Sequence, residues 1–209
     1  MKKSQSSKKW LRRHVNDPYV QRSRKEGYRS RSAYKLTEID EKDKLLRPGQ
    51  VVVDLGAAPG GWSQVAAKRV GKTGRVVAID LLAMDPVPGV DFVQGDFIKG
   101  SGLKAIGSLL GDGKADVVLS DMAPNMSGIN VSDQARSMEL AELARDFAVL
   151  HLQDAEGVFL VKVFQGAGYD EYLRSLRAMF GKVAARKPAS SRGESSEQYL
   201  LARGVKPLK

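Results

Sequence analysis

The chain has 209 residues, with 34 lysines and arginines against 24 acidic residues, and it contains two histidines and no cysteine. Its length suits one domain with a single hydrophobic core. The lack of cysteine excludes disulfides, thiolate zinc sites, iron–sulfur clusters and a cysteine nucleophile. The sequence has neither a run of about 18 apolar residues nor an N-terminal apolar segment, so we expect no membrane span and no secretory signal, and a cytoplasmic location.

The excess positive charge is concentrated near the N-terminus. Residues 1–36 hold 12 basic and two acidic side chains, whereas residues 37–181 carry more acidic than basic groups. We predict a basic RNA-binding arm at 1–36, with its first nine residues disordered, followed by a domain at 37–209. An anionic membrane is another partner that such a charge fits, and a solubilising tail or an organellar transit peptide are the less specific alternatives.

Apolar runs and helical stretches alternate along the rest of the chain. Strands are expected at Val51–Leu55, 75–79, 91–94, 116–119, Val158–Phe164, 183–186 and 199–202. Helices are expected at Gly61–Val70, 99–110, 132–153 and 169–180. The segment 81–90 is too short and too rich in proline for a full helix. Because the strands are apolar on both faces, the pattern is typical of an α/β protein with a mostly parallel sheet covered by helices on both sides.

A glycine-rich turn at 56–61 follows the first predicted strand. Its small residues would let the backbone approach a ligand closely. The spacing of its glycines does not match the dinucleotide fingerprint G-x-G-x-x-G. Gly71, Lys72 and Thr73 match the end of a phosphate loop, but they follow a helix, and Ala66 stands where the first glycine belongs. We therefore expect a nucleoside ligand without a phosphate chain.

Ionisable residues stand at or just past the ends of several predicted strands. They are Asp54, Asp80, Asp96, Asp121 and Lys162. Ligands of parallel sheets bind beyond the carboxyl ends of the strands, so we expect these groups at one rim of the sheet. Asp80 is placed to accept hydrogen bonds from ribose hydroxyls. Asp96 is expected to bind an exocyclic amine, and Phe97 to pack against a purine.

Five short motifs are spread over the chain. They are RSRSAYKL at 29–36, DLGAAPGGW at 54–62, SDMAPN at 120–125, VKVFQG at 161–166, and SSR at 190–192 followed by Glu197 and Tyr199. From about Trp10 to Gly204 the chain resembles the FtsJ-type S-adenosylmethionine-dependent RNA 2′-O-ribose methyltransferases. The resemblance implies a Rossmann-like fold with a mostly parallel seven-stranded sheet, helices on both faces and a last antiparallel strand.

The resemblance also implies a cofactor and a set of site residues. The cofactor is S-adenosyl-L-methionine, and no metal is required because the leaving group departs neutral. The residues expected to bind this cofactor are Asp54, Gly56, Pro59, Gly60, Trp62, Asp80, Asp96, Phe97 and Asp121. The catalytic Lys-Asp-Lys-Glu tetrad of the family corresponds to Lys35, Asp121, Lys162 and Glu197.

The residues themselves support a role for this tetrad. Lys162 interrupts an apolar run, where a buried ammonium is costly unless it is paired. A ribose hydroxyl must lose its proton as its oxygen attacks the methyl carbon. Lys162 is either the base, if desolvation and the nearby Lys35 favour its neutral form, or a charged group that stabilises the developing alkoxide. Asp121 orients Lys162 or takes the proton itself, and Glu197 positions Lys35 and the ribose.

The predicted substrate is the 2′-hydroxyl of a ribose in ribosomal RNA. The resemblance is strongest to bacterial members that modify a uridine of the large-subunit (23S) RNA, and we expect the assembled 50S subunit as the partner of a monomeric enzyme. Alternatives are the same chemistry on a tRNA anticodon loop or a capped mRNA, or a non-catalytic RNA-binding assembly protein. The side chains expected to bind RNA are Lys8, Lys9, Arg12, Arg13, Arg29, Arg31 and Arg192.

Overall fold

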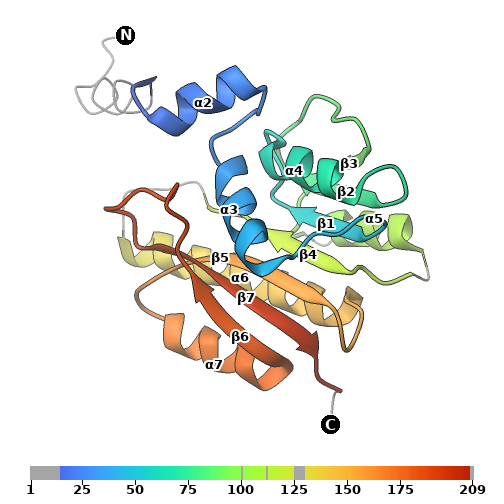
Figure 1. Ribbon diagram of the computed structural model, residues 1–209. Coiled ribbons are helices and arrows are strands. Elements are labelled where there is room, and N and C mark those ends of the chain that lie inside the picture. Colours follow the sequence, from blue (N-terminus) through green and yellow to red (C-terminus); the bar gives the residue numbers. More distant parts are fainter. Residues whose placement is uncertain (1–14, 100, 112, 125–129, 208–209) are drawn as a thin grey trace.

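One seven-stranded sheet forms the centre of the protein (Figure 1). The computed structural model describes residues 15–99, 101–111, 113–124 and 130–207. The strands are β1 (Val51–Leu55), β2 (Arg75–Asp80), β3 (Val90–Gln94), β4 (Val117–Ser120), β5 (Val158–Phe164), β6 (Phe180–Arg186) and β7 (Glu197–Val205). Their order in space is β3-β2-β1-β4-β5-β7-β6, with parallel pairs from β3 to β5 and β7 antiparallel to both of its neighbours. This is the Rossmann-like α/β sheet that the sequence predicts.

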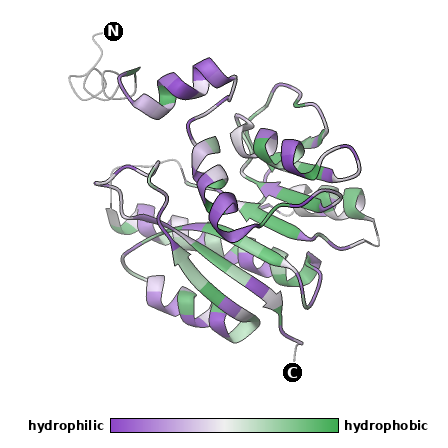
Figure 2. Cartoon of the chain, in the orientation of Figure 1, coloured by the Kyte–Doolittle hydropathy of each residue, from purple (hydrophilic) through white to green (hydrophobic). Residues whose placement is uncertain are grey.

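Helices cover both faces of the sheet. They are α3 (Ala33–Asp43), α4 (Gly61–Val70), α5 (Ser101–Leu110), α6 (Asn130–His151) and α7 (Tyr169–Met179), whereas α2 (Pro18–Glu26) belongs to neither hydrophobic cluster. Helices α3 and α4 share one hydrophobic cluster with Val52 and Val76, and α5, α6 and α7 share the other with Val53 and Val77. Neighbouring valines belong to different clusters because successive strand residues point to opposite faces. Figure 2 shows hydrophobic strands at the centre and a mostly hydrophilic α2; within the described ranges, no helix is long and apolar enough to cross a membrane.

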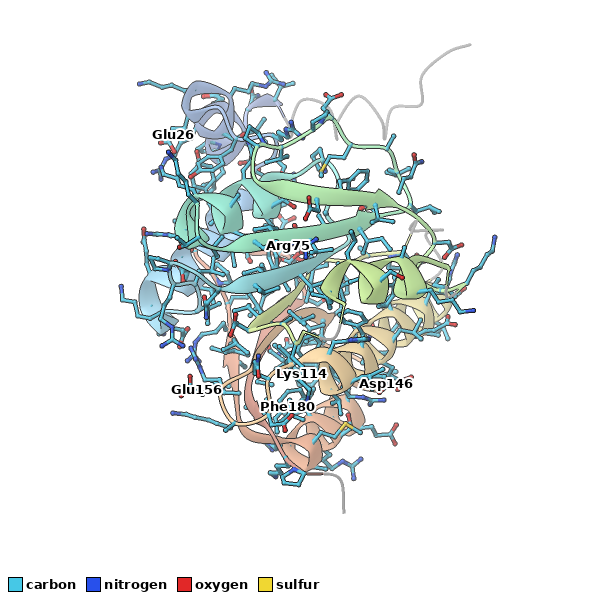
Figure 3. All side chains as sticks on the ribbon, turned by 90° about the vertical axis from the view of Figure 1, so that its right-hand side faces the viewer. Glu26, Arg75, Lys114, Asp146, Glu156 and Phe180 are labelled. Atoms are coloured by element: carbon cyan, nitrogen blue, oxygen red, sulfur yellow. The ribbon has the colours of Figure 1, made fainter. Side chains whose placement is uncertain are left out.

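The strand order reverses between β1 and β4. From β1 the chain moves outward to β2 and β3, and it then returns to β4 on the other side of β1. The chain therefore leaves the carboxyl ends of β1 and β4 in opposite directions. Parallel α/β sheets bind their ligands in the crevice at such a point. At the other end of the sheet lie exposed ion pairs, in which Arg75 contacts Asp91 at 2.8 Å and Lys114 contacts Asp154 at 2.6 Å. Arg75 and Lys114 are labelled in Figure 3. Pairs of this kind stabilise a fold only weakly.

The connection from α7 to β6 differs from the prediction. The helix predicted at 169–180 ends at Met179, and Phe180 already belongs to β6. Phe180 is buried and stacks against Phe159 of β5, with 6.0 Å between the ring centroids. Core packing thus draws this residue into the sheet, a tertiary effect that helical periodicity does not contain. Both β6 and β7 are longer than predicted.

The described part of the N-terminal arm consists of α2 and a linker to α3. The carboxylate of Asp17 caps α2 by accepting the backbone N–H of Tyr19 at 3.0 Å, and the helix ends at Gly27, which has a φ of 77°. Arg24 and Lys25 of α2 are exposed. Residues 1–14 lie outside the described residues, and they include the nine residues predicted to be disordered and the predicted RNA-binding residues Lys8, Lys9, Arg12 and Arg13.

The predicted boundary between the arm and the domain falls inside α3. Ala33, Leu36 and Ile39 of this helix are buried in the cluster that also contains α4. The first turn of α3 therefore packs with the sheet, and it carries Lys35 toward the carboxyl ends of the strands.

Candidate active site

The glycine turn joins β1 to α4 at the point where the strand order reverses. Gly56 and Gly60 have φ values of 78° and 109°, which L side chains rarely adopt. A Cβ atom at Gly56 would lie 2.6 Å from the Cγ of Met122, and one at Gly60 would lie 2.8 Å from the Sδ of Met84. Conformation therefore requires glycine at both positions, and at Gly56 the close approach of the Met122 backbone, at 3.1 Å, requires it as well.

Asp54, near the end of β1, is completely buried. Its Oδ2 accepts a hydrogen bond from the Oγ of Ser63 at 2.6 Å, and its Oδ1 has no hydrogen-bond partner among the described residues. Burial raises the pKa of Asp54 to about 7, and the carboxylates of Asp121 and Asp80 contribute in the same direction. A buried carboxyl group with such a pKa and an unsatisfied oxygen is typical of a ligand site.

The raised pKa of Asp54 makes stability depend on pH. The folded state raises this pKa from 3.8 to about 7, so it holds a proton that the unfolded chain releases between these values. The resulting stability is present at low pH and is lost as pH rises through about 7. As the pH rises from about 5 to 8, the unfolding temperature of the ligand-free wild type should therefore fall by at least about 3 °C relative to that of the Asp54→Asn variant.

Circular dichroism at several pH values measures this difference. The exposed Asp154 provides the control, because an Asp154→Asn variant should follow the wild-type curve. Parallel curves for Asp54→Asn and the wild type would show that the Asp54 carboxyl group does not titrate as the burial indicates.

Asp80, the last residue of β2, connects the glycine turn to the segment that follows β2. Its Oδ2 accepts the backbone N–H of Ala58 at 2.9 Å, and its Oδ1 accepts that of Leu82 at 2.8 Å. Each carboxylate oxygen can accept more than one hydrogen bond, so these contacts are compatible with further bonds to ribose hydroxyls.

The other predicted cofactor residues have diverse surroundings. Asp96 is partly exposed and accepts two backbone N–H groups. The buried ring of Phe97 meets that of Phe147 edge to face, with centroids 5.9 Å apart. Trp62 is buried as well, and its indole N–H donates to the carbonyl oxygen of Ser32 at 2.8 Å. Contact of the Phe97 and Trp62 rings with the cofactor stays a prediction.

Lys162 and Asp121 form a nearly buried ion pair. Lys162 lies in β5, and Asp121 follows the last residue of the neighbouring strand β4. The Nζ of Lys162 donates to the main-chain oxygen of Asp121 at 2.6 Å and lies 3.0 Å from its Oδ1. The Lys162 side chain is only 8% exposed. The pair accounts for an ammonium in an apolar strand, because loss of either partner would leave the other charge buried alone.

Lys35 and Glu197 form a second ion pair. Lys35 comes from the first turn of α3, and Glu197 is the first residue of β7. The Nζ of Lys35 donates to both carboxylate oxygens of Glu197, at 2.7 and 2.8 Å. The buried Ser191 of the SSR motif, to which the sequence assigns no site role, also donates to Glu197 through its Oγ at 3.0 Å. Glu197 is thereby held from two sides.

Tyr199 links the two ion pairs. Its hydroxyl donates to the Oδ1 of Asp121 at 3.0 Å, and the Nζ of Lys35 lies 5.6 Å from its ring centroid. Burial raises the pKa of Tyr199 well above its usual range, with further contributions from Asp121 and Glu197, so the hydroxyl stays protonated at neutral pH. All four predicted catalytic residues thus gather around one tyrosine. The sequence indicates Tyr199 through its two-residue spacing from Glu197, which puts both side chains on one side of a strand.

The described arginines predicted to bind RNA make contacts within the protein. Arg31 lies 2.8 Å from the carboxylate of Asp17 and donates to the carbonyl oxygen of Ser190. The Nε of Arg192 lies 3.7 Å from the same carboxylate. Arg29 donates to backbone carbonyls near the glycine turn. These contacts tie α2 and its linker to the body, and RNA contact by the three arginines stays a prediction.

The sequence motifs and the site geometry have a counterpart among known proteins. A family model for FtsJ-like methyltransferases matches residues 28–205, which include both ion pairs, Tyr199 and the glycine turn. The chain belongs to the FtsJ-like methyltransferase family. The resemblance found in the sequence is therefore confirmed.

This FtsJ-like methyltransferase has relatives that match its whole length. The ribosomal RNA large subunit methyltransferase E of Marinobacter nauticus is 56% identical over 206 residues, which cover 99% of each chain. The protein of the same name from Azoarcus sp. is 58% identical over 201 residues, or 96% of this chain and 98% of that one. A crystal structure described as a ribosomal RNA methyltransferase from Plasmodium falciparum has a TM-score of 0.76 and 32% identity, and it covers 85% of this chain and 98% of its own.

The cofactor of this FtsJ-like methyltransferase is S-adenosylmethionine. The residues around the glycine turn fit this molecule, which carries a positive sulfonium and an ammonium group. Asp80 and Asp121 lie close enough to Asp54 to raise its pKa, and the carboxylates of these three residues can offset the positive charge of the cofactor. The Oδ1 of Asp54, which has no partner among the described residues, offers an acceptor, and the positive φ values of Gly56 and Gly60 shape the turn beside it.

Proposed function

We propose that this FtsJ-like methyltransferase transfers the methyl group of S-adenosylmethionine to the 2′-hydroxyl of a ribose in ribosomal RNA. The target is a uridine of the 23S RNA, modified in the assembled 50S subunit. The observation that carries the proposal is the Lys162–Asp121 ion pair, joined to Lys35 and Glu197 through Tyr199. The name of the relatives, ribosomal RNA large subunit methyltransferase E, supports the large subunit as the source of the substrate.

The cofactor would be held beyond the carboxyl ends of β1, β2 and β4. The residues assigned to it are Asp54, Gly56, Pro59, Gly60, Trp62, Asp80, Asp96, Phe97 and Asp121. When bound, S-adenosylmethionine supplies an electrophilic methyl group on a sulfonium. The acidic residues of this set offset its positive charge, and Asp121 belongs both to this set and to the ion pair with Lys162.

Lys162 stabilises the negative charge that develops on the ribose oxygen. An ammonium has three N–H donors; that of Lys162 donates one to the main-chain oxygen of Asp121 and lies 3.0 Å from the Asp121 carboxylate, so even with a second donor on that carboxylate a third remains. The third is available to the ribose oxygen, in a nearly buried place where fixed charges act strongly. The hydroxyl proton passes either to the Asp121 carboxylate or to Lys162 acting as the base.

The remaining tetrad residues position the ribose. Lys35 and Ser191 hold the carboxylate of Glu197, and Tyr199 fixes one oxygen of Asp121. Such fixed groups favour the in-line arrangement of the ribose oxygen, the methyl carbon and the sulfur that the reaction requires. Correct positioning of two reactants supplies a large part of the rate of such transfers.

The large ribosomal subunit is the proposed partner of a monomeric, cytoplasmic enzyme. Basic residues of the arm, including Lys8, Lys9, Arg12 and Arg13, would contact phosphates, and the exposed Arg24 and Lys25 of α2 extend the same charge. Phosphate contacts of this kind capture RNA with little regard to its sequence.

The substrate is tested with three RNA preparations from cells that lack the enzyme: 50S subunits, protein-free 23S RNA and bulk tRNA. With labelled S-adenosylmethionine, we expect stoichiometric methylation of the 50S subunits and much slower methylation of the other two. Mass spectrometry should place the methyl group on the ribose of one uridine. Preferential methylation of tRNA would contradict the substrate class, and preferential methylation of free 23S RNA would contradict the assembled subunit as the substrate.

A further inference from the structure

Arg29 precedes α3 and extends its side chain to the glycine turn. Its Nη1 donates to the carbonyl oxygens of Asp85, at 2.5 Å, and Pro59, at 3.3 Å, and its Nη2 donates to that of Pro86 at 2.7 Å. Arginine has five N–H donors, so three of them are used within the protein. A guanidinium that serves RNA phosphates would be expected to present most of its donors to solvent. The geometry of Arg29 is that of a bridge between two backbone segments.

The backbone that carries Arg29 is itself fixed on α4. The N–H of Arg29 donates to the Oε1 of Gln64 at 2.9 Å, and the Nε2 of Gln64 donates to the carbonyl oxygen of Gly27 at 3.0 Å. The indole N–H of Trp62 donates to the carbonyl oxygen of Ser32 at 2.8 Å. The linker between α2 and α3 is therefore anchored on the first turn of α4, directly after the glycine turn.

The packing at the glycines shows how closely this linker approaches the turn. A Cβ atom at Gly60 would lie 3.1 Å from the Nη1 of Arg29, and one at Gly61 would lie 2.3 Å from the Oγ of Ser30. These glycines thus provide room for the linker. From the sequence, the close approach of a ligand is the only explanation for these small residues.

Arg29 joins two backbone segments, and the cofactor site depends on their relative position. Pro59 lies in the glycine turn, and residues 81–89 connect β2 to β3 without a helix. Asp80 binds this connection at its start, through the N–H of Leu82, and Arg29 binds it further along, at Asp85 and Pro86. Without the guanidinium, three carbonyl oxygens lose a charged donor, while the hydrogen bonds between Leu82 and Asp80 and between Gln94 and Leu81 remain at the start of the connection.

We propose that Arg29 is a positioning residue for S-adenosylmethionine, which holds the 81–89 connection against the glycine turn, and that it is not a phosphate contact for RNA. The proposal rests on the cofactor placement under the proposed function. It predicts that cofactor affinity depends on Arg29 even when no RNA is present. A phosphate contact predicts the opposite, namely normal cofactor affinity and weaker RNA binding.

Calorimetry with S-adenosylhomocysteine, without RNA, tests the proposal. We expect Arg29→Ala to weaken binding by about tenfold, in line with the loss of hydrogen bonds from a charged group. Arg29→Lys keeps the charge but cannot span both segments, so we expect a loss of similar size. Lys25→Ala removes the same charge from the exposed face of α2, and its affinity for the cofactor product should equal that of the wild type. Unchanged affinity in a folded Arg29→Ala variant would overturn the proposal.

RNA binding provides the second readout. The slope of log affinity against log salt should be the same for Arg29→Ala and the wild type, whereas loss of one phosphate contact would lower it by about 0.7–0.9. If Arg29→Ala does not fold, Gln64→Ala removes the anchor of the Arg29 backbone and is expected to weaken S-adenosylhomocysteine binding as well; normal binding by this variant would count against the proposal. Wild-type binding and RNA methylation, measured in parallel, test the proposed function separately.

Discussion

Replacing Lys162 by alanine is expected to slow methyl transfer by at least about a thousandfold at saturating RNA and cofactor. The substitution removes the ammonium that faces the developing alkoxide, and electrostatic groups of this kind contribute about 10²–10³ to a rate, with proton transfer adding a further 10²–10⁴. Single-turnover assays measure the effect on the chemical step. Affinity for S-adenosylhomocysteine should stay near that of the wild type, because the role of Lys162 lies in the reacting step.

Three comparisons make this result specific. Lys114→Ala removes an exposed lysine at the other end of the sheet and should leave the rate unchanged. Lys162→Arg keeps a positive charge that cannot be lost, so a partial rate would support electrostatic stabilisation, and a rate as low as that of Lys162→Ala would support Lys162 as the base. Because Asp121 would lose its buried partner, thermal unfolding must show that each variant is folded. A rate for Lys162→Ala within tenfold of the wild type would remove Lys162 from the mechanism.

The sheet and the rim that carries the site can be predicted from the sequence because their signals are local. Val51–Leu55 and Val158–Phe164 are apolar on both faces, as buried parallel strands must be. In a parallel sheet the carboxyl ends of the strands meet at one rim, so the sequence alone is enough to predict that Asp80 and Asp121 lie at the same rim. The fold then follows from the alternation of such strands with helices.

The pairing inside the site cannot be read in the same way, because it depends on tertiary register. Lys162 is opposite Tyr199 only because β7 inserts between β5 and β6 in antiparallel orientation. No local pattern in residues 158–164 indicates that partner. The family resemblance predicts Glu197 as a catalytic residue. The role of Tyr199 as a link between the two ion pairs follows only from its contacts with Asp121 and Lys35.

The basic residues of the arm show a different limit of the sequence. Arg29 and Arg31 contribute to the local charge in the same way as any exposed arginine, and this charge predicts RNA binding. In the structure Arg31 pairs with Asp17, and Arg29 donates to carbonyl oxygens far along the chain. A count of charges cannot distinguish a free guanidinium from one that is already bound, because the partner oxygens belong mostly to the backbone.

An RNA with a single 2′-deoxy substitution at the target nucleotide is expected to accept no methyl group. In the proposed mechanism the tetrad acts on the 2′-hydroxyl, and the substitution removes that hydroxyl while it leaves the base and the phosphates in place. Phosphate contacts supply most of the binding energy, so the modified RNA should still bind with nearly normal affinity. The expected loss of methylation is therefore a loss of chemistry at constant binding.

The central claim is that the Lys162–Asp121 pair and its neighbours methylate a ribose oxygen. Methylation of the 2′-deoxy RNA, measured beside the unmodified RNA under single-turnover conditions with labelled S-adenosylmethionine, tests this claim most directly. The account predicts full labelling of the unmodified RNA and none of the substituted RNA, with equal binding of both. Labelling of the 2′-deoxy RNA at the same nucleotide would place the methyl group on the base and would contradict the claim.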